Sequence, residues 1–183
     1  FRLGRADILL RLIPQKLYLL FRMLHGIDYP FLLSGSILTL KDTLRRIHAE
    51  KKRAFVHIDL TEGIGKDNAG LAFLAELGAD GIISTRAGLI RAAKDCGLET
   101  VQRFFLVDSH SVETAIESIR ACDPSMVELM PGVVPKVIRR FCGEIRQPVI
   151  AGGLIETREE AVQALSAGAA AISTAQPALW REV

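Results

Sequence analysis

PVIAGGLIETREEAVQALSAGAAAIST, residues 148–174, contains the alternation that decides the fold of this chain. A first apolar run ends in Gly-Gly, an amphipathic stretch follows, and a second apolar run ends in Ser-Thr. Thr157 with Glu160 three residues later forms a capping box, which predicts that a helix begins between the two runs. Gly168 stands where that helix should stop before the next strand. The segment therefore predicts a strand–helix–strand unit.

The same unit recurs along the whole sequence. Its apolar runs, which start 20 to 26 residues apart, lie at 8–13, 31–35, 54–60, 80–85, 100–107, 125–130, 148–153 and 169–174. Runs that are apolar throughout are typical of a parallel sheet covered on both faces. Eight units in series predict an α/β fold, a closed (βα)8 barrel of the TIM type, with residues 1–183 as a single domain. A doubly wound parallel sheet remains the alternative, because strand order cannot be derived from sequence.

The composition is that of a soluble globular protein, with 49% hydrophobic and 24% charged residues. No apolar run reaches the roughly 18 to 20 residues that a membrane span requires. The three cysteines, Cys96, Cys122 and Cys142, are too scattered for a disulfide framework and lack the paired spacing of a zinc site. We therefore expect a cytoplasmic protein without a membrane partner and without a bound metal.

Positive charge is concentrated in the first third of the chain. Residues 1–53 contain 11 Lys or Arg and 4 Asp or Glu, whereas the remaining residues contain 12 and 17. Such asymmetry can mark a basic face for nucleic acid. It can also have no functional meaning, since charges that are near in sequence need not share a face.

Two neighbouring strand ends have the residues of a phosphate site. Gly152 and Gly153 end one run, so backbone N–H groups can approach a ligand closely there. Ser173 and Thr174 end the next run, and AQPALW after them can open a short helix. TIM barrels place phosphate sites at their last two strands, beside a helix N-terminus. We expect these four residues to bind a phosphate group, although two ordinary tight turns would show the same pattern.

Further polar residues should reach the same end of the barrel. His57 and Asp59, two apart on the predicted strand, would point to the same side as an acid–base pair, half of a metal site or a hydrogen-bonded cluster. Arg103 is a candidate partner for a ligand phosphate, or an ion-pair partner of Glu128 or Asp59. The residues predicted to line the ligand pocket are His57, Asp59, Ser84, Arg86, Arg103 and Glu128.

No familiar catalytic set accompanies these residues. No lysine lies at a predicted strand end, which argues against Schiff-base aldolase chemistry. GIGK at 63–66 fails the Walker pattern, because Leu60 and Asp67 stand where Gly and Ser or Thr are needed. Carboxylates near the mouth show no spacing typical of magnesium ligands. The sequence thus predicts a phosphate-binding barrel with no catalytic residues.

Six segments carry a family resemblance, in order, over almost everything after residue 30. They are VHIDLTEGIGKDNAG (56–70), LGADGIISTR (77–86), QRFFLVDS (102–109), VELMPGVVPKVI (127–138), IAGGLI (150–155) and ALSAGAAAISTAQPALW (164–180). The chain resembles the glycerol-3-phosphate-responsive antiterminators, the bacterial glycerol uptake operon regulators. The resemblance implies a barrel sensor with glycerol 3-phosphate as its effector and no cofactor. It also implies action on leader messenger RNA, so that transcription reads through a terminator.

The implied RNA contact gives the basic N-terminal third a candidate role. The residues in question, on and just after the helix predicted at 40–51, are Lys41, Arg45, Arg46, Lys51, Lys52 and Arg53. An ordinary solvated helix face would carry the same charges, and no RNA-recognition motif is visible. Two alternatives stay open. One is a phosphate-binding TIM-barrel enzyme of isomerase or synthase type, with Asp59 and Glu128 as acid and base. The other is a binding module that contacts protein instead of RNA.

Overall fold

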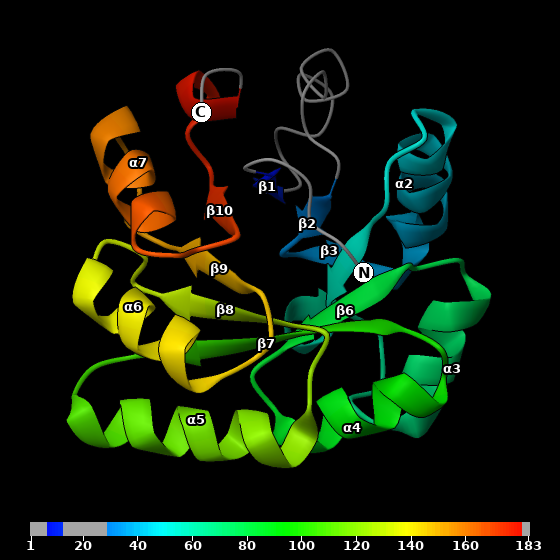
Figure 1. Ribbon diagram of the computed structural model, residues 1–183. Coiled ribbons are helices and arrows are strands. Elements are labelled where there is room, and N and C mark those ends of the chain that lie inside the picture. Colours follow the sequence, from blue (N-terminus) through cyan, green and yellow to red (C-terminus); the bar gives the residue numbers. More distant parts are fainter. Residues whose placement is uncertain (1–6, 13–28, 181–183) are drawn as a thin grey trace.

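The strands form a closed parallel barrel (Figure 1). The computed structural model describes residues 7–12 and 29–180. In spatial order the strands are β1 (Asp7–Leu12), β10 (Ala171–Thr174), β9 (Val149–Gly152), β8 (Met126–Met130), β7 (Glu99–Phe105), β6 (Gly81–Ser84), β4 (Phe55–His57) and β2 (Pro30–Leu32). Because β1 pairs with both β10 and β2, the sheet has no free edge and is not doubly wound. The predicted TIM-type barrel is confirmed.

Helices lie outside the ring of strands, as Figure 1 shows. They are α2 (Ile37–Ala49), α3 (Asn68–Glu76), α4 (Ala87–Asp95), α5 (Ser109–Cys122), α6 (Pro135–Glu144) and α7 (Arg158–Ser166). Two short 3-10 helices, η2 (Ile58–Leu60) and η3 (Pro177–Trp180), and a two-stranded pair, β3 (Gly35–Ser36) with β5 (Thr61–Glu62), complete the described elements. None of the helices described is long and apolar enough to cross a membrane.

The helix boundaries follow from local sequence. The predicted capping box is present on α7, where the Thr157 side chain accepts from Glu160 N and the Glu160 side chain accepts from the N-cap backbone. Gly78, Gly97 and Gly168 follow helices and have positive φ, the conformation that ends a helix most easily at glycine. These signals fix where each helix stops and so where the next strand can enter the barrel.

Two apolar clusters fill the molecule. The larger lies between the strands and the helices; α2, for example, contributes a buried stripe of Leu40, Leu44 and Ile47. The smaller lies inside the barrel and takes one residue from each of seven strands: Phe31, Phe55, Ile83, Val101, Met126, Ile150 and Ala171. This inner layer fixes which face of every strand points into the barrel.

Two strands end three residues earlier than predicted. The run at 54–60 is a strand only to His57, after which Ile58–Leu60 turn as a 3-10 helix. The turn is held by the Thr61 hydroxyl, which donates to the His57 carbonyl oxygen at 3.0 Å. The expectation that His57 and Asp59 lie on one strand face is therefore wrong, because Asp59 belongs to this turn. The run at 31–35 likewise ends as a strand at Leu32.

Candidate functional site

A polar layer lies on top of the inner apolar cluster. Side chains alternate along a strand, so residues two positions beyond the cluster point into the barrel near its C-terminal end. They are His57 on β4, Arg103 on β7, Glu128 on β8, Gly152 on β9 and Ser173 on β10, and all are buried. All five are predicted site residues on separate strands that the barrel brings to one level. Gly152, which has no side chain, leaves space beside the others.

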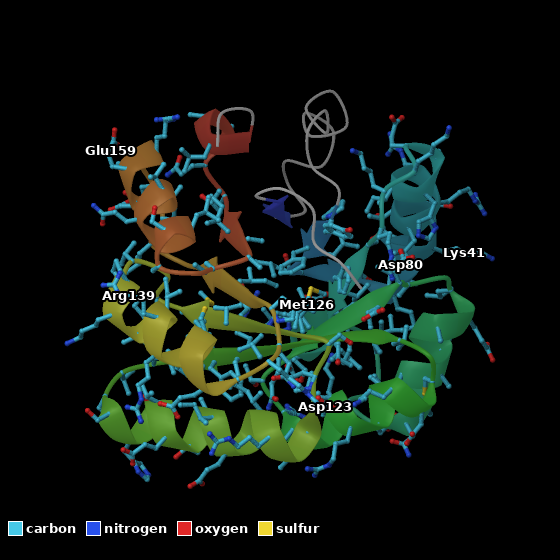
Figure 2. The ribbon with its side chains drawn as sticks, in the orientation of Figure 1. Lys41, Asp80, Asp123, Met126, Arg139 and Glu159 are labelled. Carbon is cyan, nitrogen blue, oxygen red and sulfur yellow. The ribbon has the colours of Figure 1, made fainter. Side chains whose placement is uncertain are left out.

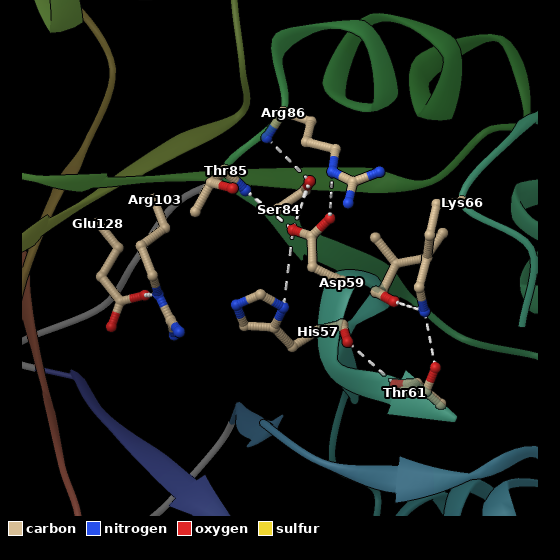
Figure 3. Close-up of polar contacts among 10 residues, drawn as sticks. His57, Asp59, Thr61, Lys66, Ser84, Thr85, Arg86, Arg103 and Glu128 are labelled. Carbon is tan, nitrogen blue, oxygen red and sulfur yellow. Dashed lines mark hydrogen bonds and ion pairs between the residues drawn. The ribbon is translucent and has the colours of Figure 1, made fainter. Parts of the chain in front are cut away.

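Arg103 and Glu128 form an ion pair inside the barrel. Their strands pair at this position, and Arg103 Nε donates to Glu128 Oε2 at 2.6 Å (Figure 3). The side chains are 4% and 0% exposed, so both charges are removed from water. The pair uses only one edge of the guanidinium. Arg103 Nη2 is buried and has no hydrogen-bond partner in the described part of the chain.

Ser173 and Gly152 lie opposite each other on β10 and β9. The Ser173 hydroxyl is fully buried and, within the described residues, has no hydrogen-bond partner. A Cβ on Gly152 would come within 2.4 Å of Glu128 Oε1, so only glycine leaves room for this carboxylate. Buried polar groups are almost always satisfied in native proteins. Two unsatisfied donors, Arg103 Nη2 and the Ser173 hydroxyl, therefore indicate a place where a polar ligand or water completes the structure.

Asp59 is held by residues at the end of β6. Its Oδ2 accepts from the Ser84 hydroxyl at 2.8 Å and from Thr85 N at 3.1 Å, and Arg86 Nε lies 3.2 Å from its Oδ1 (Figure 3). His57 Nδ1 is 3.9 Å from Oδ2. With these donors around it, Asp59 orients the β6 end rather than presenting a free carboxylate. Ser84 and Arg86 thus join the site through Asp59.

Lys66 is a residue of this region that sequence reasoning missed. Its Nζ donates to the carbonyl oxygens of Ile58 and Thr61 and so ties the segment after β4 to the 3-10 turn. Burial lowers the pKa of Lys66, while Asp59 acts in the opposite direction and Arg86 lowers it further. Nothing in GIGK at 63–66 predicts this role. The lysine contacts backbone carbonyl oxygens, which every residue has, so no side-chain pattern marks its partners.

Three of the four residues of the predicted phosphate seat, all except Gly152, line a hollow of about 120 Å³. Gly153, Ser173 and Thr174 line it, together with residues that include Ile155 and Gln176. Gly153 has φ +76°, a conformation that favours glycine. The Thr174 hydroxyl donates to the Ile155 carbonyl oxygen at 2.8 Å and accepts from Gln176 N, so it holds the two loops together. The expected helix after it is the 3-10 helix η3.

The predicted RNA-binding residues lie on and after α2, as expected. Lys41, Arg45, Arg46 and Lys51 are exposed, whereas Lys52 and Arg53 are half-buried. Arg45 lies 3.2 Å from Asp42 and Arg53 lies 3.5 Å from Asp80, so both take part in ion pairs.

Arg53 lies two residues before the start of β4. The end of this basic segment is therefore at the opposite end of the barrel from His57. Within the described residues no three His, Cys, Asp or Glu side chains gather as metal ligands would.

Comparison with known proteins identifies the family of this chain. The family model described as glycerol-3-phosphate responsive antiterminator matches residues 18–180. The chain belongs to this family. A solved structure, the glycerol uptake operon antiterminator regulatory protein from Listeria monocytogenes, matches this antiterminator-family fold with a TM-score of 0.92 and 31% identity, covering 100% of this chain and 99% of that one.

Two further relatives agree. A glycerol uptake operon antiterminator-related protein from Thermotoga maritima superposes with a TM-score of 0.85 at 36% identity, over 98% of this chain and 100% of that chain. The protein YgcP of Escherichia coli K12 is 38% identical over 149 residues, 81% of this chain and 78% of its own length. The family and its solved relatives are regulatory antiterminators, not enzymes. The expectation of a regulator is confirmed, and the enzyme alternative is not pursued.

Proposed function

We propose that this protein binds glycerol 3-phosphate in the mouth of its barrel and then acts on leader RNA of glycerol-utilisation genes, so that transcription passes a terminator. The observation that supports ligand binding most directly is a pair of buried donors, Arg103 Nη2 and the Ser173 hydroxyl, which have no partner among the described residues. Both project from inward-facing positions of the same polar layer of the barrel. A ligand oxygen placed between them would satisfy both.

The chemistry of the mouth suits a phosphorylated polyol. A phosphate group needs several donors, and Arg103, Ser173 and the backbone around Gly153 supply them at the C-terminal strand ends. His57 and Glu128 lie at the same level and can accept or donate hydrogen bonds to hydroxyl groups. We infer that the phosphate lies toward β9 and β10 and that the glycerol hydroxyls face β4 and β8. No cofactor enters this scheme; the effector alone supplies the signal.

Calorimetric titration of the purified protein with glycerol 3-phosphate tests the proposal, with glycerol and inorganic phosphate as comparison ligands. We expect saturable binding that is much tighter than to either control, because only the complete molecule engages both halves of the mouth. Binding no tighter than that of inorganic phosphate would show that the glycerol hydroxyls are not recognised. No binding at all would remove glycerol 3-phosphate as the effector.

Gly153→Asp and Gly153→Asn form a matched pair of variants. Any side chain at Gly153 meets positive φ and would place its Cβ 2.9 Å from Met130 Cε, so both variants carry the same strain. They differ by one negative charge beside the phosphate. We expect Gly153→Asp to lose glycerol 3-phosphate binding and Gly153→Asn to retain more of it. Equal affinity in both variants would place the phosphate elsewhere.

A further inference from the structure

A groove of about 490 Å³ lies between α5 and α6 at the C-terminal end of the barrel. We call it the α5–α6 groove. Its walls come from the segment after β7, with Leu106 and Val107, and from the segment after β8 and the start of α6, with Pro131, Val134 and Val137. Val107 is 85% exposed, which is unusual for a valine beside so much other apolar surface. The groove is thus an apolar surface open to a partner.

The edge of this groove is basic. Lys136 lines it, and Arg139 lies one helical turn farther along α6, where Figure 2 shows it on the outer side of the helix. Within the described residues neither side chain has a hydrogen bond or an ion pair. Arg140 also lines the groove but is engaged by Glu144 at 2.8 Å. Within the described residues, Lys136 is therefore an unpaired cation beside the apolar walls, and Arg139 is a second one on the outer side of the same helix.

One carboxylate, that of Asp108, lies in the groove together with these cations. Asp108 caps α5, and its side chain accepts from Ser111 N at 2.7 Å. These hydrogen bonds from Ser111 lower the pKa of Asp108, so the carboxylate stays ionised but faces the positive end of the α5 dipole. The surface left for a partner is apolar in the middle and cationic along α6.

Single-stranded RNA has the complementary chemistry. Its unpaired bases pack on apolar or aromatic side chains, while its phosphates pair with Lys and Arg along the edge. Building on the proposed function, we propose that the α5–α6 groove holds a single-stranded segment of the leader RNA. The bases contact the walls around Val107, and the phosphates contact Lys136 and Arg139.

Two alternatives fit the surface less well. In a symmetric dimer the same patch meets itself, so Lys136 and Arg139 of both copies would share one interface while Asp108 is already engaged. The basic segment of α2 is the other candidate RNA face. Its far end, near Arg53, lies at the opposite end of the barrel from the ligand mouth, whereas the groove lies at the same end.

The groove is also joined to the ligand site through two strands. Arg103 and Glu128 lie on β7 and β8, and the groove walls begin a few residues farther along the same strands. Leu106 N donates to the Met130 carbonyl oxygen at 2.8 Å, which ties the two strand ends together. A ligand that changes the Arg103–Glu128 pair therefore acts on the elements that shape the groove.

Charge reversal at the groove tests the proposal. Fluorescence anisotropy would follow a labelled leader transcript of a glycerol uptake gene and a short single-stranded RNA of mixed sequence. We expect Lys136→Glu with Arg139→Glu to weaken RNA binding at least about 10-fold and to reduce the slope of log affinity against log salt by about 1.4, since single strands contribute about 0.7 per phosphate. Val107→Glu should weaken binding without removing a cation.

Lys41→Glu with Lys51→Glu is the control for the rival RNA face, because it makes the same charge change at two exposed lysines of the α2 segment. If the groove holds the RNA, this variant weakens RNA binding less than the groove variant does. Circular dichroism and glycerol 3-phosphate titration verify that each variant is folded. Loss of binding in the control but not in the groove variants would move the RNA face to α2.

Two other outcomes are decisive. A dimer that Val107→Glu dissociates, with unchanged RNA affinity, would make the groove a self-interface. Wild-type protein that binds glycerol 3-phosphate but neither RNA would overturn both this proposal and the RNA half of the proposed function.

Discussion

Arg103 and Glu128 keep two charges inside the barrel, 4% and 0% exposed. Removing a charge from water is costly, and the attraction of a buried pair often only offsets that cost. A pair of apolar side chains would fill the same positions without the free-energy cost of removing two charges from water. The pair is therefore better explained by what it binds than by the stability it gives, since Arg103 retains an unpartnered donor within the described part of the molecule.

Arg103→Met should destabilise the fold strongly, because it leaves the Glu128 carboxylate buried without its cation. We expect a loss of about 3–5 kcal/mol in the free energy of unfolding, measured with urea at neutral pH. Adding Glu128→Leu should recover most of that loss, since the orphaned charge is gone. Neither variant should bind glycerol 3-phosphate. If the free energy of unfolding of Arg103→Met stays within about 1 kcal/mol of the wild-type value, water reaches this ion pair as it reaches surface ion pairs.

Positions of strands and helices could be predicted from the sequence because they depend on local signals. Each apolar run became a strand, and the capping box at Thr157 begins a helix as predicted. Closure of the barrel could not be derived in this way, because it depends on β1 pairing with both β10 and β2. The helix expected between the first two runs lies in residues 13–28, outside the described residues.

The candidate site was predictable only in part. Which residues reach the mouth follows from the period of two along a strand, so His57, Arg103, Glu128 and Ser173 could be named. Their partners depend on register between strands and on the 3-10 turn after β4. Ser84 and Arg86 contact Asp59 only because the end of β6 lies beside the 3-10 turn after β4. Lys66 likewise donates to two carbonyl oxygens of that turn region only once the chain has folded. No local pattern encodes such contacts.

Asp123 joins three elements at the end of the barrel where the strands begin (labelled in Figure 2). It ends α5 in the left-handed conformation, and its carboxylate accepts from Arg146 at 2.9 Å and from Gln147 at 2.8 Å before β9, while Lys94 of α4 lies 3.4 Å away. The hydrogen bond from Arg146 contributes most to lowering the pKa of Asp123. The ionised carboxylate of Asp123 thus links α4, the end of α5 and the segment before β9.

Asp123→Asn should destabilise the protein in a pH-dependent way. Asparagine also tolerates the left-handed conformation, so the change removes charge with little strain. Because the folded-state pKa lies below the ordinary 3.8, the contribution is present above that value and is lost as pH falls through the lower folded-state pKa. The side chain is 47% exposed, so the loss at pH 7 should stay below about 1 kcal/mol. Urea midpoints of both proteins should converge in acid; a constant difference would contradict the ionic role.

At the scale of the whole molecule, the barrel gathers the proposed functions at one end. The mouth residues, the hollow at Gly153 and the α5–α6 groove all lie at the C-terminal strand ends, whereas the Asp123 network lies at the other. This division is usual in TIM barrels, where one face carries stability and the other carries ligands. A regulator needs its two ligands to influence each other, and short paths along β7 and β8 suit that need.

Linkage makes the coupling measurable from either side. If glycerol 3-phosphate tightens RNA binding by some factor, saturating RNA must tighten glycerol 3-phosphate binding by the same factor, which for allosteric proteins is about 5–150-fold. Titrations of ligand with and without leader RNA, and of RNA with and without ligand, give both values. Because the coupling is proposed to pass through β7 and β8, the groove variant Lys136→Glu with Arg139→Glu should retain ligand affinity in the absence of RNA but show no RNA-dependent increase. If RNA leaves the glycerol 3-phosphate affinity of the wild type unchanged, the two sites are not thermodynamically coupled. A ligand shifts a conformational equilibrium only by the difference in its affinity for the two states.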